Sequence, residues 1–383
     1  MDRHCLMIPG PTPVPVRAAL AGAGPMINHR GPEFGALLRE VTERLQRILL
    51  TGHTVLMFPA AGTGGMEAVA ANLVEPGERV LVAVAGEFGA RFAEIMRVAG
   101  ADVRTLDFEW GTAVDPAVVG TALEQDPSIG VVVVTHNETS TGVTMDLAGI
   151  RRAIPRDDVL LVADAISSVG AIELRPDEWG VDVVVGASQK GLMTPPGLAL
   201  VALSPRAWEK AGRTRCRSVY WDFAAARRFL EHPTPQTPYT PAVSLLYALR
   251  ESLRMLEAEG LENVFRRHAV LARAVRAGVR ALGLGTLAGE DCASSTVTAV
   301  VLPDGLEGKK LLGLLRQKYG VVLAGGQGRL AGRIFRIGHV GQVNWQDVVV
   351  TLAALEMACL DLGREVERGR AVAAAEEVLG AEG

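Results

Sequence analysis

Residues 130–135 read Gly-Val-Val-Val-Val-Thr, and residues 159–164 read Val-Leu-Leu-Val-Ala-Asp. Successive side chains of an extended chain point to opposite faces, so both segments are apolar on both faces. Such strands are typical of a mostly parallel sheet that helices cover on both sides. The two segments therefore indicate an α/β fold.

Strand-like and helix-like segments alternate around these two. Five further segments are apolar or β-branched and are predicted to be strands: 54–58, 80–84, 102–106, 181–185 and 198–203. Four segments between the strands have helical spacing: 64–73, 90–99, 116–125 and 147–154. The pattern predicts seven strands in one large α/β unit.

The pattern changes after residue 213. Residues 220–241 contain Pro233, Pro235, Pro238 and Pro241, and so many prolines argue against a regular element there. Helices are predicted at 242–259, 262–282, 309–318 and 344–362, strands at 296–302 and 334–337, and a charged surface helix at 364–379. We expect an N-terminal arm (1–20), a large domain (21–258) and a smaller C-terminal α/β domain (259–383).

The composition narrows the class of protein. The chain has 383 residues, of which 49% are hydrophobic and 21% charged, and its formal net charge is −4. The lack of a basic excess argues against nucleic-acid binding, and no segment is apolar over the ~18 residues that a membrane span needs. The four cysteines are scattered without the spacing of a zinc site or a disulfide framework, so we expect no metal site. Such cysteine use and the lack of an apparent signal-peptide segment predict a cytoplasmic location.

Glycine is abundant, at 43 residues, and one group of glycines lies between a predicted strand and a predicted helix. Gly62-Thr63-Gly64 begins as a dinucleotide-binding G-x-G-x-x-G motif does, but Glu67 stands where the third glycine is required. Small residues at the start of a helix still expose free N–H groups that suit a phosphate. A tight turn without a ligand explains this segment equally well.

Three more residues with distinctive chemistry follow predicted strands. Asp164 ends an apolar strand, where an ionised carboxylate is costly unless it has a cationic partner such as a protonated ring nitrogen. Lys190 lies in a loop of small residues, where desolvation can make it nucleophilic, and Phe88 between two glycines suits stacking on a flat ring. Taken singly, Lys190 also suits a solvated surface and Phe88 a core. Together with a phosphate site at Gly62–Gly64 they fit pyridoxal 5'-phosphate (PLP), because ligands of open α/β sheets bind at the carboxyl ends of the strands.

Several motifs, in the same order, resemble class V aminotransferases. They are Pro9-Gly10-Pro11-Thr12, Gly62-Thr63-Gly64-Gly65-Met66-Glu67-Ala68, Thr135-His136-Asn137-Glu138-Thr139-Ser140-Thr141-Gly142, Asp164-Ala165-Ile166-Ser167-Ser168, Ser188-Gln189-Lys190-Gly191 and Arg336-Ile337-Gly338. The set is similar to the alanine/serine–glyoxylate (or pyruvate) aminotransferase branch and extends to about residue 362. The resemblance implies a fold-type I PLP enzyme whose large domain has a mostly parallel seven-stranded sheet.

The resemblance also implies a role for each matching residue. Lys190 would form a Schiff base with PLP, and Asp164 would hold the pyridine nitrogen. The other cofactor-binding residues would be Thr63, Gly64, Gly65, Phe88, Thr139, Ile166, Gln189 and, from the neighbouring subunit, Thr240. Gly10 and Arg336 would bind the substrate. Ala61 and Gly65 depart from the residues of many relatives, and either Tyr239 or the region of Thr237 would take the place of a tyrosine found in some of them.

A role for Arg336 can also be inferred without the resemblance, because Arg336 lies in an apolar strand. A guanidinium there needs a planar anion, which a substrate carboxylate provides, and a structural ion pair with Asp or Glu is the alternative. His29 and His136 are further candidates near the pocket, and a structural role suits each of them as well.

The predicted reaction is a two-stage, ping-pong transamination. A small amino acid, alanine or serine, would give up its amino group, and glyoxylate or pyruvate would accept it. The small residues Gly10, Gly65 and Ile166 favour a short donor, and no second arginine for a side-chain carboxylate is apparent. Ureidoglycine or aminoethylphosphonate transamination, and less favourably a cysteine desulfurase that uses Cys216 or Cys292, are alternatives within the class. An NAD-type enzyme or a non-catalytic scaffold is the alternative outside it.

The proline-rich segment 220–241 and the arm at Pro9–Pro15 suit contacts between subunits. We therefore expect a homodimer with shared active sites.

Overall fold

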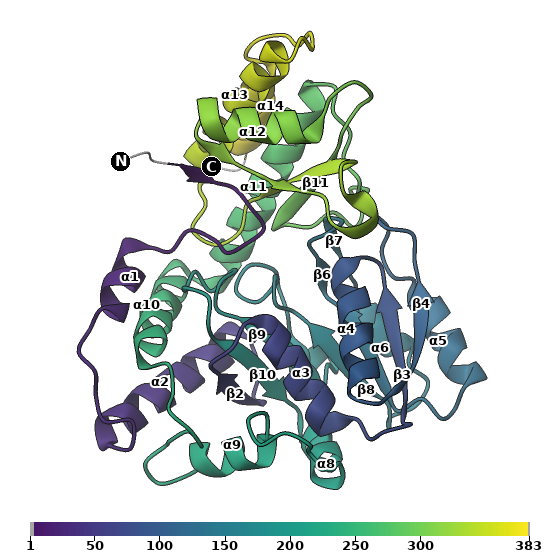
Figure 1. The fold of residues 1–383 in the computed structure, drawn as a ribbon, viewed down its shortest axis with the longest axis vertical. Coiled ribbons are helices and arrows are strands. Elements are labelled where there is room, and N and C mark those ends of the chain that lie inside the picture. The colour runs from purple at the N-terminus through teal and green to yellow at the C-terminus, as the bar shows by residue number, and fades with distance from the viewer. Residues whose placement is uncertain (1–3, 382–383) are drawn as a thin grey trace.

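The computed structural model describes residues 4–381. Residues 1–3, the start of the predicted arm, and 382–383, the end of the predicted small domain, lie outside this range. Figure 1 shows a broad lower part built on a large sheet and an upper part with the C-terminal helices. Within residues 4–381 no helix is long and apolar enough to cross a membrane, and no three His, Cys, Asp or Glu side chains gather as a metal site requires.

The large sheet has seven strands. Their order is β2 (Thr54–Phe58), β10 (Ala199–Leu203), β9 (Val183–Ala187), β8 (Leu160–Asp164), β5 (Val131–Thr135), β3 (Arg79–Val84) and β4 (Asp102–Asp107). Only β10 runs opposite to the other six strands. The predicted mostly parallel, seven-stranded sheet is confirmed, and the largest shift from the predicted bounds is two residues, at β9.

Alternate residues of the central strands pack into two separate cores. On one face Val131 and Val133 contribute to a core with α3 (Gly62–Leu73) and α4 (Glu87–Val98). On the other face Val132 and Val134 contribute to a core with α2 (Pro32–Ile48), α5 (Pro116–Gln125), α6 (Leu147–Ala153) and α10 (Val243–Glu259). This arrangement explains why the strand has no polar face.

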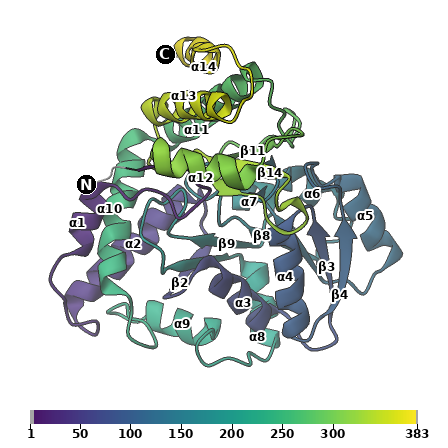
Figure 2. The same ribbon diagram turned by 45° about the horizontal axis from the view of Figure 1, so that its top comes forward.

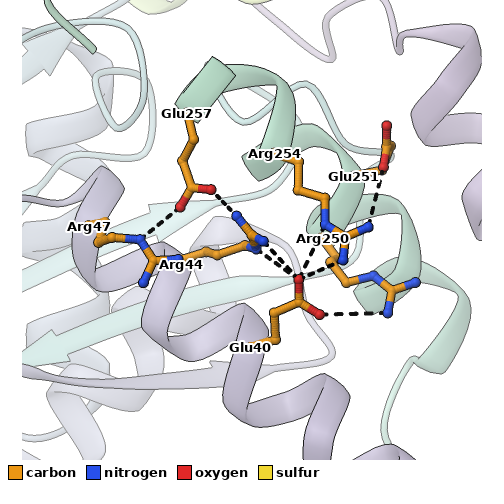
Figure 3. Close-up of polar contacts among 7 residues, drawn as sticks. All are labelled: Glu40, Arg44, Arg47, Arg250, Glu251, Arg254 and Glu257. Atoms are coloured by element: carbon orange, nitrogen blue, oxygen red, sulfur yellow. Dashed lines mark hydrogen bonds and ion pairs between the residues drawn. The ribbon is translucent and has the colours of Figure 1, made fainter. Parts of the chain in front are cut away.

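A network of ion pairs joins α2 and α10 (Figure 3). Its members are Glu40, Arg44 and Arg47 of α2 and Arg250, Glu251, Arg254 and Glu257 of α10. Glu40 pairs with Arg44 at 2.9 Å and with Arg254 at 2.8 Å. Burial acts to raise the pKa of Glu40, but the two guanidiniums outweigh it and lower that pKa. The hydroxyl of Ser252 in α10 donates to the carbonyl of Met193 at 3.2 Å. Helix α10, which the ion pairs fix against α2, therefore also contacts the loop that carries Lys190.

The C-terminal part forms a smaller α/β unit above the large sheet (Figure 2). Its three-stranded antiparallel sheet has the order β11 (Val297–Val301), β14 (Ile334–Gly338) and β13 (Ala324–Gly325). The helices are α11 (Leu261–Ala281), α12 (Gly308–Lys318), α13 (Trp345–Asp361) and α14 (Arg370–Gly380). The N-terminal strand β1 (Cys5–Leu6) pairs in parallel with β12 (Val321–Val322) of this unit. The domain boundaries at residues 20 and 258 stay predictions.

One expectation about the proline-rich segment was wrong. A regular element was excluded throughout 220–241, but α9 (Phe223–Leu230) lies inside it, with Asp222 capping the amide of Ala225 at 2.9 Å. The four prolines begin only at Pro233, so they leave residues 223–230 free to form a helix. Helices α1 (Val16–Gly22), α2, α7 (Pro176–Trp179) and α8 (Pro205–Arg213) had no prediction either.

The charged tail is helical, but its helix begins only at Arg370 and is not wholly at the surface. Ala371 and Ala375 of α14 are fully buried in the core of the smaller unit. The prediction of a surface helix was therefore wrong for these alanines, which form the packing face of α14.

Candidate active site

Strands β2, β3, β8 and β9 run in the same direction, so their carboxyl ends lie at one edge of the large sheet. Asp164 is the last residue of β8, and Lys190 follows β9 by three residues. Phe88 and Thr63 lie in the first turns of α4 and α3, which follow β3 and β2. The topology thus brings together predicted site residues that are far apart in the sequence.

Lys190 is held with its amine turned toward the N-terminal arm. Its Nζ donates to the carbonyl of Pro9 at 2.6 Å. Burial lowers the pKa of Lys190 to about 8, and the charge of Arg336 acts in the same direction while Asp164 opposes both. The neutral amine, which is the nucleophilic and basic form, is therefore well populated near pH 8.

The arm packs closely against the lysine loop. Gly10 has φ of +132°, and a Cβ there would collide with Lys190 Nζ, so both its conformation and its contact require glycine. Thr12 donates its N–H to the carbonyl of Gln189 and its hydroxyl to that of Lys190, each at 3.1 Å. On the arm's other side, Gly338 at the end of β14 donates to the carbonyl of Met7 at 2.8 Å. The arm therefore connects the Lys190 loop to the strand of Arg336.

Asp164 is buried, with 3% of its surface exposed, and its carboxylate accepts the N–H of Ile166 at 3.0 Å. Burial raises the pKa of Asp164 to about 7, against which that hydrogen bond acts, and the charge of Glu138 raises it further. Among residues 4–381, Lys190 and Arg91 act on the pKa of Asp164 only through their charges, and the one hydrogen bond to its carboxylate comes from the amide of Ile166. A carboxylate in this position favours a cation beside it.

The raised pKa of Asp164 predicts a pH-dependent cost to stability in the cofactor-free protein. Because the pKa is raised on folding, the stability contribution is fully present below pH ~4 and is lost as the pH rises through about 7. The side chain in Asp164→Asn does not titrate. The melting temperature of this variant, relative to that of the wild type, should therefore rise between pH 5 and pH 8.5. The gain should reach a few °C, since 1 kcal/mol corresponds to about 2–4 °C in chains of 150–250 residues and to less in a chain of 383. Melting curves of both proteins, with exposed Asp304→Asn as control, measure it, and a pH-independent difference would contradict it.

The start of α3 approaches the Asp164 loop very closely. A Cβ on Gly62 would meet Ile166 Cδ1 at 2.5 Å, so the first turn of α3 lies directly against Ile166. Gly62 and Thr63 are the first two residues of α3, so their N–H groups have no carbonyl partner within the helix. These N–H groups are therefore available to an anion. The amide of Gly64 differs, because it donates to the carbonyl of Ala61 at 2.9 Å.

The neighbouring glycines face in different directions. A Cβ on Gly64 would meet the Trp221 ring at 2.8 Å, and one on Gly65 would meet Val185 Cγ1 at 2.9 Å. Gly65 therefore faces the sheet and serves close packing of α3 upon it, and only its backbone is left to take part in a binding site.

Two buried polar atoms at this edge have no hydrogen-bond partner within the part of the chain that the structure describes. They are Oε1 of Gln189 and the hydroxyl of Thr135, which ends β5 beside Asp164. Buried polar atoms are rarely left unpaired in folded proteins, so these two point to a polar ligand. With the buried Asp164 and the low pKa of Lys190, they fit the chemistry of PLP.

Arg336 is buried, with 6% exposed, in β14 of the smaller unit. Its Nε donates to the carbonyl of Gly325 at 2.9 Å and its Nη1 to that of Thr139 at 3.1 Å. Both of these bonds go to backbone carbonyls and neither to a carboxylate, so the structural ion pair considered from the sequence is not found within residues 4–381. Burial lowers the pKa of Arg336, which the charge of Glu138 opposes. Within residues 4–381 only Nη2 of this guanidinium makes no hydrogen bond, so it can donate to an anionic ligand.

Phe88 and Thr240 are two further candidate residues of this site. Phe88 is half-buried, and the guanidinium of Arg91 lies 5.0 Å from the centroid of its ring. Thr240 is exposed, next to Tyr239, whose ring stacks on Tyr220 with centroids 4.3 Å apart. The hydroxyl of Thr237 donates to the carbonyl of Tyr239 at 2.6 Å, so both candidates for the missing tyrosine lie in one loop.

His136 has a structural arrangement. Its N–H donates to the carbonyl of Asp164, and its Nδ1 hydrogen-bonds the hydroxyl of Ser168, each at 2.8 Å. Burial lowers the pKa of His136 to about 4, so the ring is neutral at physiological pH. Burial raises the pKa of the Cys216 and Cys292 thiols, which disfavours the thiolate that a desulfurase needs.

Sequence reasoning assigned no role to three residues of this site. Pro9 and Thr12 lie in the first motif of the resemblance, but their contacts with the Lys190 loop appear only in the folded chain. Glu138 could have been found, because it is an ionisable residue inside the motif at 135–142 with hydrophobic strands before it.

Comparison with known proteins gives one family. The family model of aminotransferase class-V matches residues 18–334. Serine–glyoxylate aminotransferase of Methylorubrum extorquens is 39% identical over 98% of this chain and 96% of its own. A protein named the 42 kDa subunit of soluble hydrogenase from Anabaena cylindrica is 42% identical over 99% of both chains.

A solved structure extends the likeness to three dimensions. Pyridoxamine–pyruvate aminotransferase of Mesorhizobium loti aligns with a TM-score of 0.96 and 30% identity over 100% of this chain and 98% of its own. This agreement confirms the predicted fold class. Because the family model spans most of the chain, and the fold and the ordered motifs agree with it, the protein is an aminotransferase and belongs to the class V aminotransferase family.

Proposed function

We propose that this protein is a PLP-dependent transaminase that moves an amino group from a small amino acid to glyoxylate or pyruvate in two stages. The observation that carries the proposal is the placement of Lys190 beside Gly10 and Pro9, with Asp164 and Arg336 close enough for their charges to shift its pKa. A proton-transferring amine, a carboxylate for a ring nitrogen and a carboxylate-binding guanidinium are what transamination requires.

PLP, when bound, supplies an aldehyde and an electron-withdrawing ring that stabilises negative charge at the substrate α-carbon. Lys190 would anchor it and Asp164 would keep its ring nitrogen protonated. The other residues proposed to hold it are Thr63, Gly64, Gly65, Phe88, Thr139, Ile166, Gln189 and the partner subunit's Thr240. The free amides at the start of α3 suit its phosphate.

The protein's own residues then perform the proton transfers. Arg336 would bind the substrate carboxylate through Nη2, the nitrogen that donates to neither Gly325 nor Thr139. Lys190, once released, would take the proton from the substrate α-carbon as a neutral amine and deliver it, as an ammonium, to C4' of the cofactor within the same stage. The second stage runs the same transfers in reverse on the oxo acid.

Alanine and serine are the proposed donors, because Gly10 leaves no side chain next to Lys190 and Ile166 lies directly against the start of α3. We expect these two to give the highest kcat/KM in a panel that also holds aspartate, phosphoserine, ureidoglycine and aminoethylphosphonate, each assayed with glyoxylate and with pyruvate. Product oxo acid is measured by chromatography. A protein that releases sulfide from cysteine without forming an oxo acid, or that stays colourless with added PLP, would refute the proposal.

A homodimer with shared sites is proposed on the position of the Thr240 segment. Thr240 and Val219 are exposed, and Tyr220 of the same surface donates to the carbonyl of Pro59 at 3.3 Å, three residues before α3. A partner that covers this surface would therefore reach the phosphate end of the site. We also propose a cytoplasmic location, which suits Cys216, Cys292 and Cys359 as thiols.

Mixing two inactive variants tests the shared site. Lys190→Ala lacks the amine, and Thr240→Glu places a negative charge beside the phosphate. In a mixed dimer, one site combines the intact Lys190 of one subunit with the intact Thr240 of the other, so unfolding and refolding the two together should restore activity that neither has alone. Light scattering gives the mass, and a monomer that is active at low concentration would contradict the prediction.

A further inference from the structure

Glu138 has no role in the proposed reaction, although it lies at the site and is fully buried. It ends the short strand β6 (Asn137–Glu138) and is 0% exposed. Its Oε2 accepts the N–H groups of Phe88 at 3.0 Å and Gly89 at 3.1 Å. Its Oε1 accepts the N–H of Ser140 at 3.1 Å and the hydroxyl of Ser140 at 2.5 Å. Four donors thus converge on one carboxylate.

These bonds cap helix α4 from a segment about 50 residues away. The N-cap of α4 is Gly86, which has no side chain to accept the amides of the first turn. A carboxylate at a helix N-terminus satisfies such amides and interacts favourably with the helix dipole. Ser140 extends the cap, because its hydroxyl accepts the N–H of Glu87 at 2.9 Å. A Cβ on Gly86 would collide with Cγ and Cδ of Glu138, so the glycine makes room for this carboxylate.

The capped turn and the capping turn both contain site residues. Phe88, proposed to stack on the PLP ring, lies in the first turn of α4 and is held by Glu138 through its own amide. Thr139, next to Glu138, accepts the bond from Arg336 at 3.1 Å. Burial raises the pKa of the Glu138 carboxyl, and its four hydrogen bonds act to lower it. Residues 138–140 therefore link the ring-stacking residue to the substrate-binding arginine.

We propose that Glu138 is a positioning residue of this active site, which holds Phe88 in register with the cofactor ring by capping α4. The inference rests on the proposed PLP-dependent function, because Phe88 needs a ring to stack on. Glu138 acts through the backbone of Phe88 rather than by touching cofactor or substrate. Small displacements of such a ring weaken binding, since stacking depends on ring position.

The test measures the affinity of cofactor-free protein for PLP by absorbance titration, together with the melting temperature. The variants are Glu138→Ala, Glu138→Gln, Phe88→Ala and the double variant Glu138→Ala/Phe88→Ala. Asp182→Asn is the matched control, because Asp182 is also a buried carboxylate, 2% exposed, that accepts a backbone N–H at 2.9 Å and pairs with Arg206 at 2.8 Å. It immediately precedes β9 and so lies at the opposite edge of the sheet from Lys190.

We expect Glu138→Ala to raise the Kd for PLP about tenfold and Glu138→Gln by less, because glutamine keeps one oxygen for Phe88 and Gly89. In the Phe88→Ala background the loss of Glu138 should change the Kd less than twofold, since it acts through Phe88. Asp182→Asn should lower the melting temperature but leave the Kd within twofold of the wild type.

Three results would overturn the role of Glu138: an unchanged Kd in Glu138→Ala, an equal tenfold loss in the Phe88→Ala background, or an equal loss in Asp182→Asn. If Glu138→Ala does not fold, Glu138→Gln alone and combined with Phe88→Ala decides the question in the same way. A wild-type protein that does not bind PLP would refute the proposed function instead, so the two failures are distinguishable.

Discussion

Lys190→Ala should lose nearly all transaminase turnover, with kcat reduced by about 10⁴-fold or more. The variant lacks the amine that is proposed both to anchor the cofactor and to move the α-carbon proton, and general acid–base catalysis alone contributes about 10²–10⁴-fold. The pKa of Lys190, lowered to about 8 mainly by burial, keeps this amine partly neutral at working pH.

Three measurements make the Lys190 prediction specific. Stopped-flow absorbance should show that the variant no longer forms the wild-type cofactor band, and its first stage should be slow in single turnover. Added small amines should restore part of the proton transfer by entering the space of the missing side chain. The control is Lys309→Ala, because Lys309 is exposed. Full turnover in Lys190→Ala would show that another residue moves the proton.

Arg336→Gln should lower kcat/KM for the amino acid by about 30- to 1000-fold, mainly through KM. This range corresponds to a loss of about 2–4 kcal/mol, which is typical when one partner of a buried charge-assisted pair is removed. Arg336→Lys should recover little, because an ammonium cannot hold the carbonyls of Gly325 and Thr139 and a carboxylate with the same fork geometry.

A substrate amine that has no carboxylate distinguishes the loss of carboxylate binding at Arg336 from a structural effect of the substitution. The first stage with ethylamine should proceed at similar rates in the wild type and in Arg336→Gln, whereas the rate with alanine should fall. Arg333→Gln, at an exposed position three residues earlier, is the control. If ethylamine and alanine lose equally, Arg336 has a structural role and another group binds the carboxylate.

The strands could be predicted from the sequence because their signal is local. Residues 131–135 and 160–164 are buried on both faces, and the continuous apolar run records that burial directly. The helix α9 was missed for an equally local reason, since a count of prolines over 220–241 obscured the proline-free stretch at 223–230. The buried face of α14 could not be read from its alanines, because it depends on the core of the smaller unit.

The candidate site also has features that the sequence predicts and features that depend on tertiary contacts. Asp164, Lys190 and the opening of α3 follow strand ends, so the sequence order and the direction rule for parallel sheets were enough to group them. What chemistry each residue can perform was decided in three dimensions. The pKa of Lys190 depends on burial and on the charges of Asp164 and Arg336, and the position of Arg336 depends on Thr139, almost 200 residues away.

Local patterns of hydrophobicity and turn chemistry are thus enough to specify the elements and their order, because each element carries its burial pattern in its own residues. Desolvation and Coulomb interactions act between residues that only folding brings together. The contact of Pro9 with Lys190 and the capping of α4 by Glu138 are of this second kind. They exist only once the arm, the two sheets and the loops between them have packed, and so only the tertiary structure determines them.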